Sequence, residues 1–465
     1  MGSWPMSIST FQPDGAARPL ARLLSADAAL FALAYVLVPN VPFMAMWYFI
    51  TPRRLFAVPF YLIAGLIAVR LPLWAAAALF AGVAGFDVLL VISGIFDLSP
   101  RLVLDAIQFA PLLDLGGSAL YAGLGVIVAS TVALIVWLTG RYRPRLTSAS
   151  PLLALVVMFA WLGVEASANV SVNKLFGEHM TSLVKFDSAL NRSGLAARQP
   201  GKDRNLLIVM VEGMGAYADP RHAGLLSALI DTDAVREKYD FSHGTSPYLG
   251  STTGAAAREL CGEWGSYLDY RDGPPKPCLP RRLSLAGYES VALHGFTQKF
   301  FDRDIWYPKI GFDRTLFAEQ LVRDRVDGHD RVCGLTFKGF CDNDVGEVAR
   351  GMLTQRDGKR RFVYWLTLNT HMPFDIDQAT HRFGCAANGG IFADKTVCYL
   401  SEMWADIVAQ VASIATDPEL PPTDILIVGD HHTPLFTRTA RGLFAPGKVA
   451  WFALKAKTSE NISRR

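Results

Sequence analysis

The chain has 465 residues, and its 45 Lys and Arg nearly balance its 42 Asp and Glu, for a net charge of +3. This balance, and the lack of a basic stretch with interleaved aromatic residues, argues against a nucleic acid partner. Hydrophobic residues make up 51% of the chain, and most of the apolar stretches lie before residue 170. The composition therefore indicates a membrane part followed by a globular part.

Five apolar stretches are predicted to cross a membrane, because each approaches the 20 or so residues that a bilayer requires. They are residues 26–50, 54–71, 73–96, 117–139 and 150–169. Asp87 lies in the third stretch, and we expect it to face another helix because a carboxylate is costly in lipid. The alternative, a soluble core of buried helices, is disfavoured because these stretches offer few polar faces to water.

These stretches predict four parts of the chain. Residues 1–25 form a polar cytoplasmic leader, residues 26–170 an α-helical transmembrane domain with five helices, residues 171–204 a connecting segment, and residues 205–465 an extracytoplasmic domain.

The arginines next to the predicted spans indicate how they are oriented. Arg18, Arg22 and three arginines between 141 and 145 lie in segments that we expect to face the cytoplasm. Five spans then put the C-terminal half outside, although Arg53 and Arg54 oppose this orientation. The first span is too long for a cleavable signal peptide and lacks a cleavage site.

Six cysteines all follow the last predicted span. An even number of cysteines confined to the outer part indicates disulfides in an oxidising compartment. We predict pairing of sequence neighbours, because each bond would then close one loop. The predicted pairs are Cys261 with Cys278, Cys333 with Cys341, and Cys385 with Cys398. Free buried thiols are the alternative, and a zinc cluster is disfavoured because the chain has no CxxC motif.

The C-terminal half alternates short apolar runs with helical patterns. Runs at 205–211, 289–293, 362–370, 424–429 and 449–454 are predicted strands, and 341–356 and 394–415 are predicted helices. Apolar runs of this length are typical of parallel strands buried on both faces. We therefore expect an α/β domain with a mainly parallel central sheet.

Four of these runs lead into residues suited to metal or phosphate chemistry. They are Glu212, His294, His371 and the triplet Asp430, His431 and His432. The carboxyl ends of parallel strands meet at one edge of a sheet, where ligands bind in open α/β folds. The sequence therefore predicts a metal-dependent active site at that edge.

Several segments resemble, in order, those of the lipoteichoic acid synthases and the periplasmic phosphoglycerol transferases, members of the alkaline phosphatase/sulfatase superfamily. The segments are 212–215 (EGMG), 250–253 (GSTT), 294–303 (HGFTQKFFDR), 311–313 (GFD), 369–374 (NTHMPF) and 429–431 (GDH). The resemblance covers residues 205–435, and the five predicted spans match the synthase architecture. It implies an alkaline phosphatase/sulfatase-like fold and a phospholipid headgroup transferase.

The resemblance implies that Glu212, Asp430 and His431 bind one divalent metal ion together with a nucleophilic threonine. A carboxylate and an imidazole suit Mn or Zn, with Mg as a further option. Thr252 is the favoured nucleophile, because it lies two residues after a glycine as in the synthases and opens a predicted helix. Thr253 is its rival and a candidate substrate-binding residue.

Other residues are expected to bind the substrate. His294 and Arg303 match positions close to bound phosphoglycerol in the synthases, and His371 is also a candidate acid or base. Phe301 stands where the synthases have Trp. His432 either faces the pocket, as we predict, or caps the turn. A core histidine is the alternative for His294.

The predicted reaction moves a phosphoglycerol group from phosphatidylglycerol to an envelope glycan or lipid-linked acceptor, through a phosphothreonine, on the periplasmic side of a bacterial inner membrane. A phosphoethanolamine transferase acting on lipid A or a glycan is the second hypothesis. A phosphodiesterase or sulfatase-like hydrolase is the third, although the formylglycine context of sulfatases is missing around Thr252. A non-catalytic glycan-binding protein is the fourth.

Overall fold

The computed structural model describes residues 25–47, 54–96, 98–117, 119–168, 184–200, 203–323 and 331–457. Its contacts define two compact units. The first comprises residues 1–47, 51–91 and 123–173, and the second comprises residues 48–50, 92–122 and 174–465. The predicted leader lies almost wholly outside the described residues, as does the first part of the predicted connecting segment. The four predicted boundaries therefore stay a prediction.

The first unit is helical. Its elements are α2 (Ala26–Ala32), η1 (Leu33–Leu37), α3 (Val38–Asn40), η2 (Val41–Trp47), α4 (Ala57–Ala68), α5 (Leu73–Phe96), α7 (Ala119–Arg141), α8 (Arg143–Ser148) and α9 (Leu152–Ala168). In the described part of the chain, three helical stretches are long and apolar enough to cross a membrane: Ala26–Met44, Leu73–Phe96 and Tyr121–Arg141.

The prediction of five spans is not confirmed, because α4 and α9 are shorter apolar helices of 12 and 17 residues. At 1.5 Å per residue, α4 extends roughly 18 Å, well below the hydrocarbon thickness of about 30 Å. Apolar residues continue in the sequence beyond the ends of both helices, so the predicted stretches are longer than the helices.

A buried ion cluster joins the helices of the first unit. The Arg54 guanidinium donates from Nε to Asp87 Oδ1 at 2.8 Å, and from Nη1 to Glu165 Oε1 at 3.1 Å and to Asn40 Oδ1 at 2.7 Å. Trp161 Nε1 donates to Glu165 Oε1 at 2.9 Å. Asp87 therefore does face other helices, as predicted, and Arg54 is an internal partner of two carboxylates rather than a loop charge.

The second unit contains an eight-stranded sheet with the order β2-β10-β9-β1-β8-β4-β5, in which β3 also pairs with β10. Its strands are β1 (Asn205–Val211), β2 (Gly215–Tyr217), β3 (Tyr239–Pro247), β4 (Tyr288–His294), β5 (Arg314–Leu316), β8 (Arg360–Leu366), β9 (Thr423–Gly429) and β10 (Phe444–Ala456). A separate hairpin joins β6 (Val332–Cys333) to β7 (Gly339–Phe340).

All five predicted strands and both predicted helices form. The sheet, however, is mixed rather than mainly parallel. Strands β9, β1, β8, β4 and β5 are parallel to one another, whereas β10 runs antiparallel to β9, β2 and β3. Strand β3 was not predicted, because its residues 239–247 are mostly polar and partly exposed.

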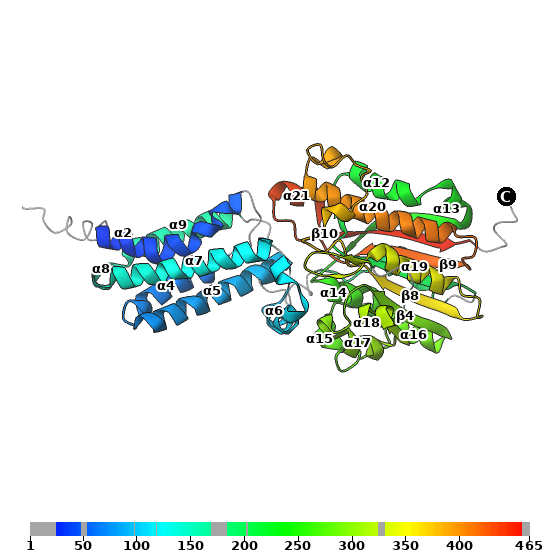
Figure 1. The fold of residues 1–465 in the computed structure, drawn as a ribbon, viewed down its shortest axis with the longest axis horizontal. Coiled ribbons are helices and arrows are strands. Elements are labelled where there is room, and N and C mark those ends of the chain that lie inside the picture. Colours follow the sequence, from blue (N-terminus) through cyan, green and yellow to red (C-terminus); the bar gives the residue numbers. More distant parts are fainter. Residues whose placement is uncertain are drawn as a thin grey trace, which may run out of the picture. The chain divides into compact units, whose positions relative to one another are not determined.

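Helices cover both faces of this sheet (Figure 1). Alternate residues of β1 face opposite sides: Leu207 and Val209 join one hydrophobic core, and Leu206 and Ile208 join the other.

The first core includes α12 (Pro220–Ile230), α13 (Asp233–Lys238), α19 (Asp342–Leu353), α20 (Lys395–Thr416) and α21 (Arg438–Gly442). The second includes α11 (Ala189–Arg192), α14 (Thr252–Ala256), η6 (Ala257–Cys261), α15 (Tyr267–Tyr270), α16 (Leu279–Leu285), η7 (Phe300–Asp302) and α17 (Arg303–Ile310). The remaining short helices are η5 (Ala196–Arg198), α18 (Ala318–Arg323), η8 (Ile376–Gln378) and η9 (Gly390–Phe392).

The segment between α5 and α7 belongs to the second unit. It contains α6 (Pro100–Ala106), η3 (Ile107–Leu112) and η4 (Leu115–Gly117), and Phe109 is part of the second hydrophobic core. The three predicted disulfides all form, between Cys261 and Cys278, Cys333 and Cys341, and Cys385 and Cys398.

Candidate active site

Two neighbouring parallel strands bring the predicted metal ligands together. Glu212 follows β1 and Asp430 follows β9, and the last residues of these strands, Val211 and Gly429, are paired in register. Ligand atoms of Glu212, Asp430 and His431 all lie within 4.8 Å of one another. The His431 Nε2 atom is 3.4 Å from Glu212 Oε1 and 3.3 Å from Asp430 Oδ2.

The hydrogen bonds around these three residues fit a divalent cation. His431 Nδ1 lies 2.8 Å from the His432 carbonyl oxygen, which can only accept, so Nδ1 carries the proton and Nε2 has a free lone pair. Asp430 Oδ1 accepts from the Gly213 N–H at 2.7 Å, whereas its Oδ2 is buried and has no hydrogen-bond donor among the described residues.

The charges in this cluster are unbalanced. Burial and the Glu212 carboxylate raise the pKa of Asp430 to about 7. Burial alone would lower the pKa of His431, but Asp430 and Glu212 outweigh it and raise that pKa. Two buried carboxylates and one imidazole are a donor set that suits a divalent metal, which would supply positive charge to this cluster. Glu212, Asp430 and His431 would be its protein ligands.

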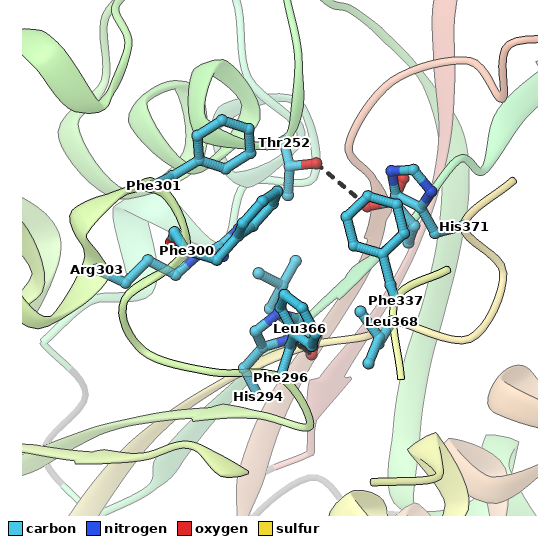
Figure 2. Close-up of a pocket in the computed structure, with 11 residues that line it drawn as sticks. Thr252, His294, Phe296, Phe300, Phe301, Arg303, Phe337, Leu366, Leu368 and His371 are labelled. Atoms are coloured by element: carbon cyan, nitrogen blue, oxygen red, sulfur yellow. Dashed lines mark hydrogen bonds between the residues drawn. The ribbon is translucent and has the colours of Figure 1, made fainter. Parts of the chain in front are cut away.

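Thr252 lies directly beside this cluster. It is the first residue of α14, and its Oγ1 donates to Glu212 Oε2 at 3.1 Å and lies 3.4 Å from His431 Nε2. Thr252 also lines the pocket (Figure 2). Its rival Thr253 is buried and does not line the pocket, so the geometry favours Thr252 as the nucleophile.

The pocket next to Thr252 is mostly aromatic. Figure 2 shows the side chains around it. The apolar lining residues are Phe296, Phe300, Phe301, Phe337, Leu366 and Leu368. Phe301 adopts φ 56° and ψ 35°, a left-handed backbone conformation that is rare for an aromatic residue. Glu212 is the only carboxylate among the described residues that line this pocket.

Two neutral histidines line the pocket. His294 ends β4, and its Nδ1 lies 2.9 Å from the Leu366 carbonyl oxygen. His371 Nδ1 lies 2.8 Å from the Met372 carbonyl oxygen. Burial lowers the pKa of His371 to about 4, and burial followed by the Arg303 charge lowers that of His294 well below its usual value. Each ring therefore donates from Nδ1 and keeps a lone pair on Nε2.

Arg303 also lines the pocket and is almost fully buried. Its Nη1 donates to the Phe300 carbonyl oxygen at 3.1 Å, and its Nε has no hydrogen-bond acceptor in the described residues. A buried guanidinium with an unused donor suits a phosphate oxygen or a hydroxyl.

His432 and His371 lie differently from the sequence expectation. His432 Nε2 bonds the Lys448 carbonyl oxygen at 2.7 Å, and its ring packs against Tyr248 and Phe444. It is not among the residues that line the pocket, and its bond goes to β10 and not to the turn itself, so neither the predicted substrate contact nor the alternative of a turn cap is seen. β8 ends at Leu366, so His371 reaches the pocket from the following loop.

Arg258 was not predicted from the sequence, although it holds the loop that carries the candidate ligands Asp430 and His431. Its Nη2 donates to the Gly429 carbonyl at 2.8 Å, and its Nη1 donates to that of Asp430 at 3.1 Å. Its Nε donates to Glu259 at 2.7 Å, and Glu259 accepts the N–H groups of Ala189 and Leu190. An Arg-Glu pair in a predicted buried helix was the signal that could have identified it.

Another buried carboxylate, Asp342, holds the loop that carries His371. Asp342 accepts the N–H groups of Leu368 at 2.9 Å and Asn369 at 2.8 Å. Burial is the main reason that its pKa rises to about 7. The Glu212 carbonyl oxygen accepts bonds from Thr370 Oγ1 at 2.6 Å and Trp404 Nε1 at 3.2 Å. These contacts fix the backbone around the site, and no local sequence pattern indicated them.

A protein family model described as Sulfatase matches residues 204–448, more than half of the chain. The chain therefore belongs to the sulfatase family. It is 24% identical over 192 residues to phosphoglycerol transferase I of Escherichia coli, an alignment that covers 41% of this chain and 23% of that protein. It is 26% identical over 149 residues to lipoteichoic acid synthase 1 of Bacillus subtilis, covering 31% and 22%.

These matches confirm the resemblance that the sequence segments indicated, although they span less than a quarter of either relative's length. Among solved structures, the lipoteichoic acid synthase LtaP of Listeria monocytogenes aligns with a TM-score of 0.39 and 16% identity, covering 56% of this chain and 66% of that one. The phosphoethanolamine transferase EptA of Neisseria meningitidis aligns with a TM-score of 0.44 and 14% identity, covering 95% and 88%.

Proposed function

We propose that the protein is a membrane-anchored, metal-dependent transferase that moves phosphoglycerol from phosphatidylglycerol to an envelope glycan. The observation that carries this proposal is the position of the Thr252 hydroxyl, 3.1 Å from Glu212 Oε2 and 3.4 Å from His431 Nε2. A threonine hydroxyl is a weak nucleophile unless a base or a cation activates it. Here a carboxylate already accepts its hydrogen bond, at the edge of a carboxylate-imidazole cluster.

The reaction would have two steps. In the first, Thr252 Oγ1 attacks the phosphorus of the lipid headgroup, the bond from phosphorus to the diacylglycerol oxygen breaks, and the Thr252 proton passes by way of Glu212 to that oxygen. In the second, an acceptor hydroxyl attacks the phosphothreonine, phosphoglycerol moves to the acceptor, and Thr252 regains a proton. A divalent ion bound at Glu212, Asp430 and His431 supplies positive charge for the phosphoryl oxygens.

The chain's own side chains would orient the substrate. Arg303 has an unused Nε donor for a phosphate oxygen. His371 is neutral at physiological pH, because its pKa lies at about 4, so its Nε2 can accept the proton of the attacking alcohol. The aromatic wall formed by Phe296, Phe300, Phe301 and Phe337 would exclude water from the phosphothreonine and so favour transfer over hydrolysis.

The pocket lining favours glycerol over ethanolamine as the transferred headgroup. An ethanolamine ammonium requires a partner of opposite charge, but the only lining carboxylate in the described chain, Glu212, belongs to the metal cluster. Glycerol hydroxyls instead need neutral acceptors, and the Nε2 atoms of His294 and His371 provide them. Phosphatidylglycerol is therefore the proposed donor.

The apolar helices and the disulfides support a location in the bacterial inner membrane, with residues 205–465 as a periplasmic catalytic domain and residues 26–170 as the anchor. An anchor keeps the pocket near the plane of the lipid headgroups. The carboxylate and imidazole ligands favour Mn or Zn as the bound ion, with Mg as a further option.

The test uses the purified full-length protein, phosphatidylglycerol labelled in its headgroup, and a mixture of envelope glycans. We expect metal-dependent release of diacylglycerol, labelled glycan, and a labelled Thr252 peptide in mass spectra of the quenched reaction. Thr252→Ala should lower the rate by at least about 10³-fold, whereas Thr253→Ala should retain activity.

The products of the same assay discriminate the other classes of enzyme. Diacylglycerol and free glycerol phosphate without labelled glycan would indicate a hydrolase. Transfer from phosphatidylethanolamine alone would indicate the phosphoethanolamine class. Bound metal without any turnover would indicate a binding protein, and each of these results would refute the proposed function.

A further inference from the structure

The segment between the apolar helices α5 and α7 packs on the wall of the pocket. Phe109 of η3 is buried, and its ring centroid lies 5.7 Å from that of Phe300 and 5.5 Å from that of Phe301. Both of these phenylalanines line the pocket beside Thr252. One residue of this segment therefore supports the wall of the candidate active site.

Polar contacts fix the same segment to the second unit. Asp105 of α6 accepts a hydrogen bond from the Tyr267 hydroxyl and pairs with Arg271 Nη2 at 3.0 Å. Further along, the Asp114 N–H donates to the Thr336 carbonyl oxygen at 3.0 Å. Thr336 directly precedes Phe337, another residue of the pocket lining. The segment is thus held at two points on either side of Phe109.

The other side of this segment is apolar and exposed. Leu104 is 56% exposed and Ile107 is 61% exposed, and Leu112 and Leu115 are exposed to 37% and 41%. Leu104 and Ile107 are three residues apart in consecutive helical turns, so they share a face, whereas Val103 and Phe109 are buried. Such an amphipathic segment is typical of a helix that lies in the interface of a membrane.

The connectivity of the chain indicates what covers this face. α5 ends at Phe96 and α7 begins at Ala119, and both helices are long and apolar enough to cross a bilayer. A segment of about 20 residues between two spans cannot leave the membrane surface by more than its own length. This short connection to two apolar helices favours a phospholipid surface as the partner of the exposed leucines and isoleucine.

We infer that Leu104, Ile107, Leu112 and Leu115 form a lipid-contacting platform that inserts into the outer leaflet of the bilayer. Through Phe109, this platform supports the pocket wall at Phe300 and Phe301 while its own apolar face contacts the membrane. The partner is a phospholipid surface. This contact does not depend on which group the enzyme transfers, so it goes beyond the proposed reaction.

Fluorescence quenching tests the platform without an activity assay. All six native cysteines are in disulfides, so one introduced cysteine is the only site for a thiol-reactive dye. Ile107→Cys and the matched control Leu285→Cys are made in the full-length protein. Leu285 is an exposed apolar residue, 71% accessible, on α16, a helix that adjoins neither span in sequence.

Both labelled proteins are reconstituted into phosphatidylglycerol-phosphatidylcholine vesicles that carry nitroxide groups near the top of the acyl chains. We expect a blue-shifted, strongly quenched dye at residue 107, and an unquenched dye at residue 285. Equal and negligible quenching at both residues would overturn the inference. Strong quenching at both would also overturn it, because the contact would then not be specific to the platform.

A second measurement rests on the proposed function. Leu104→Glu combined with Ile107→Glu should lower transfer from vesicle-embedded phosphatidylglycerol by about tenfold and leave transfer from a dispersed short-chain analogue unchanged. An equal loss on both donors would contradict the platform, since it would indicate a damaged pocket. Failure of the unmodified protein to act on either donor would refute the proposed function and leave the quenching result to decide the platform.

Discussion

Two clusters of buried charge, one in each unit, differ in how their charges are balanced. In the first unit, Arg54 donates to Asp87 and Glu165 through all three of its guanidinium nitrogens. In the second unit, Glu212 and Asp430 lie beside His431 without an arginine or lysine among the candidate ligands. In the part of the chain that the structure describes, Asp430 Oδ2 is buried without a donor, whereas the four carboxylate oxygens of Asp87 and Glu165 all accept hydrogen bonds.

This difference separates a structural cluster from a functional one. Buried charge that is fully hydrogen-bonded within the chain fixes the arrangement of helices. Buried charge with an unused oxygen and a raised pKa is typical of a site that binds something else. The same physical rule therefore favours a structural role for the first cluster and supports the proposed metal binding at the second.

The largest effect is expected from removing a metal ligand. Asp430→Ala should abolish bound metal and lower the rate of transfer by more than about 10³-fold, because the cation and its charge are lost together. Metal analysis and the transfer assay measure the two effects. Asp219→Asn, at an exposed helix cap, is the control. Unchanged metal content in Asp430→Ala would contradict the ligand assignment.

The next largest effect concerns the cluster of the first unit. Arg54→Ala should destabilise the protein by about 3–5 kcal/mol, because two buried carboxylates lose their cation. Thermal unfolding in detergent measures this change. Arg145→Ala is the matched control, since Arg145 and Asp27 form an exposed pair with side chains 48% and 39% accessible, worth under about 1 kcal/mol. Equal effects in both variants would show that the buried cluster stabilises the protein no more than an exposed ion pair does.

A smaller effect is expected at Arg258, which bonds the backbone of the loop that carries the candidate ligands Asp430 and His431 and is not itself a candidate ligand. Arg258→Lys keeps the charge but cannot bond Gly429, Asp430 and Glu259 together, so metal affinity should fall about 10- to 100-fold. Metal titration measures this, and excess metal should restore the rate. Arg350→Lys on the surface of α19 is the control. A lower melting temperature with unaltered metal affinity would assign Arg258 a purely structural role.

The smallest effect is a dependence of stability on pH. Burial lowers the pKa of His371 to about 4 from its ordinary value of 6.5. Between these values the unfolded chain binds the proton and the folded chain does not, so stability falls as the pH drops from 6.5 to 4, by up to about 1.4 kcal/mol per pH unit. Chemical unfolding of metal-free protein should show a shallower slope for His371→Gln. Parallel slopes would contradict the lowered pKa.

The sequence alone predicted much of the catalytic unit, because the relevant patterns are local. The strands β1, β4, β8 and β9 are apolar runs, and their ends carry Glu212, His294 and Asp430. Parallel pairing then brings those ends to one edge of the sheet. The pairing of each cysteine with the next cysteine along the chain was also predicted from their spacing in the sequence, since each such bond closes a short loop.

Other features depend on contacts between distant residues, which no local pattern encodes. The prediction of five spans is not confirmed, because apolar composition does not mark where the shorter helices α4 and α9 end. The antiparallel direction of β10 was not predicted, because a buried apolar run looks the same in either direction, and β3 was missed because it is mostly polar. The buried position of His432 beside the pocket depends on the carbonyl of Lys448, 16 residues later.

The sequence by itself determined which chemical groups this protein brings to its active site, because residue type and the ends of buried strands are readable along the chain. Only the tertiary structure decided which of those groups share a pocket, which buried charges are already satisfied, and which arginine holds the ligand loop. The physical reason is that hydrophobic periodicity is a property of neighbours in sequence, whereas burial and charge balance are properties of neighbours in space.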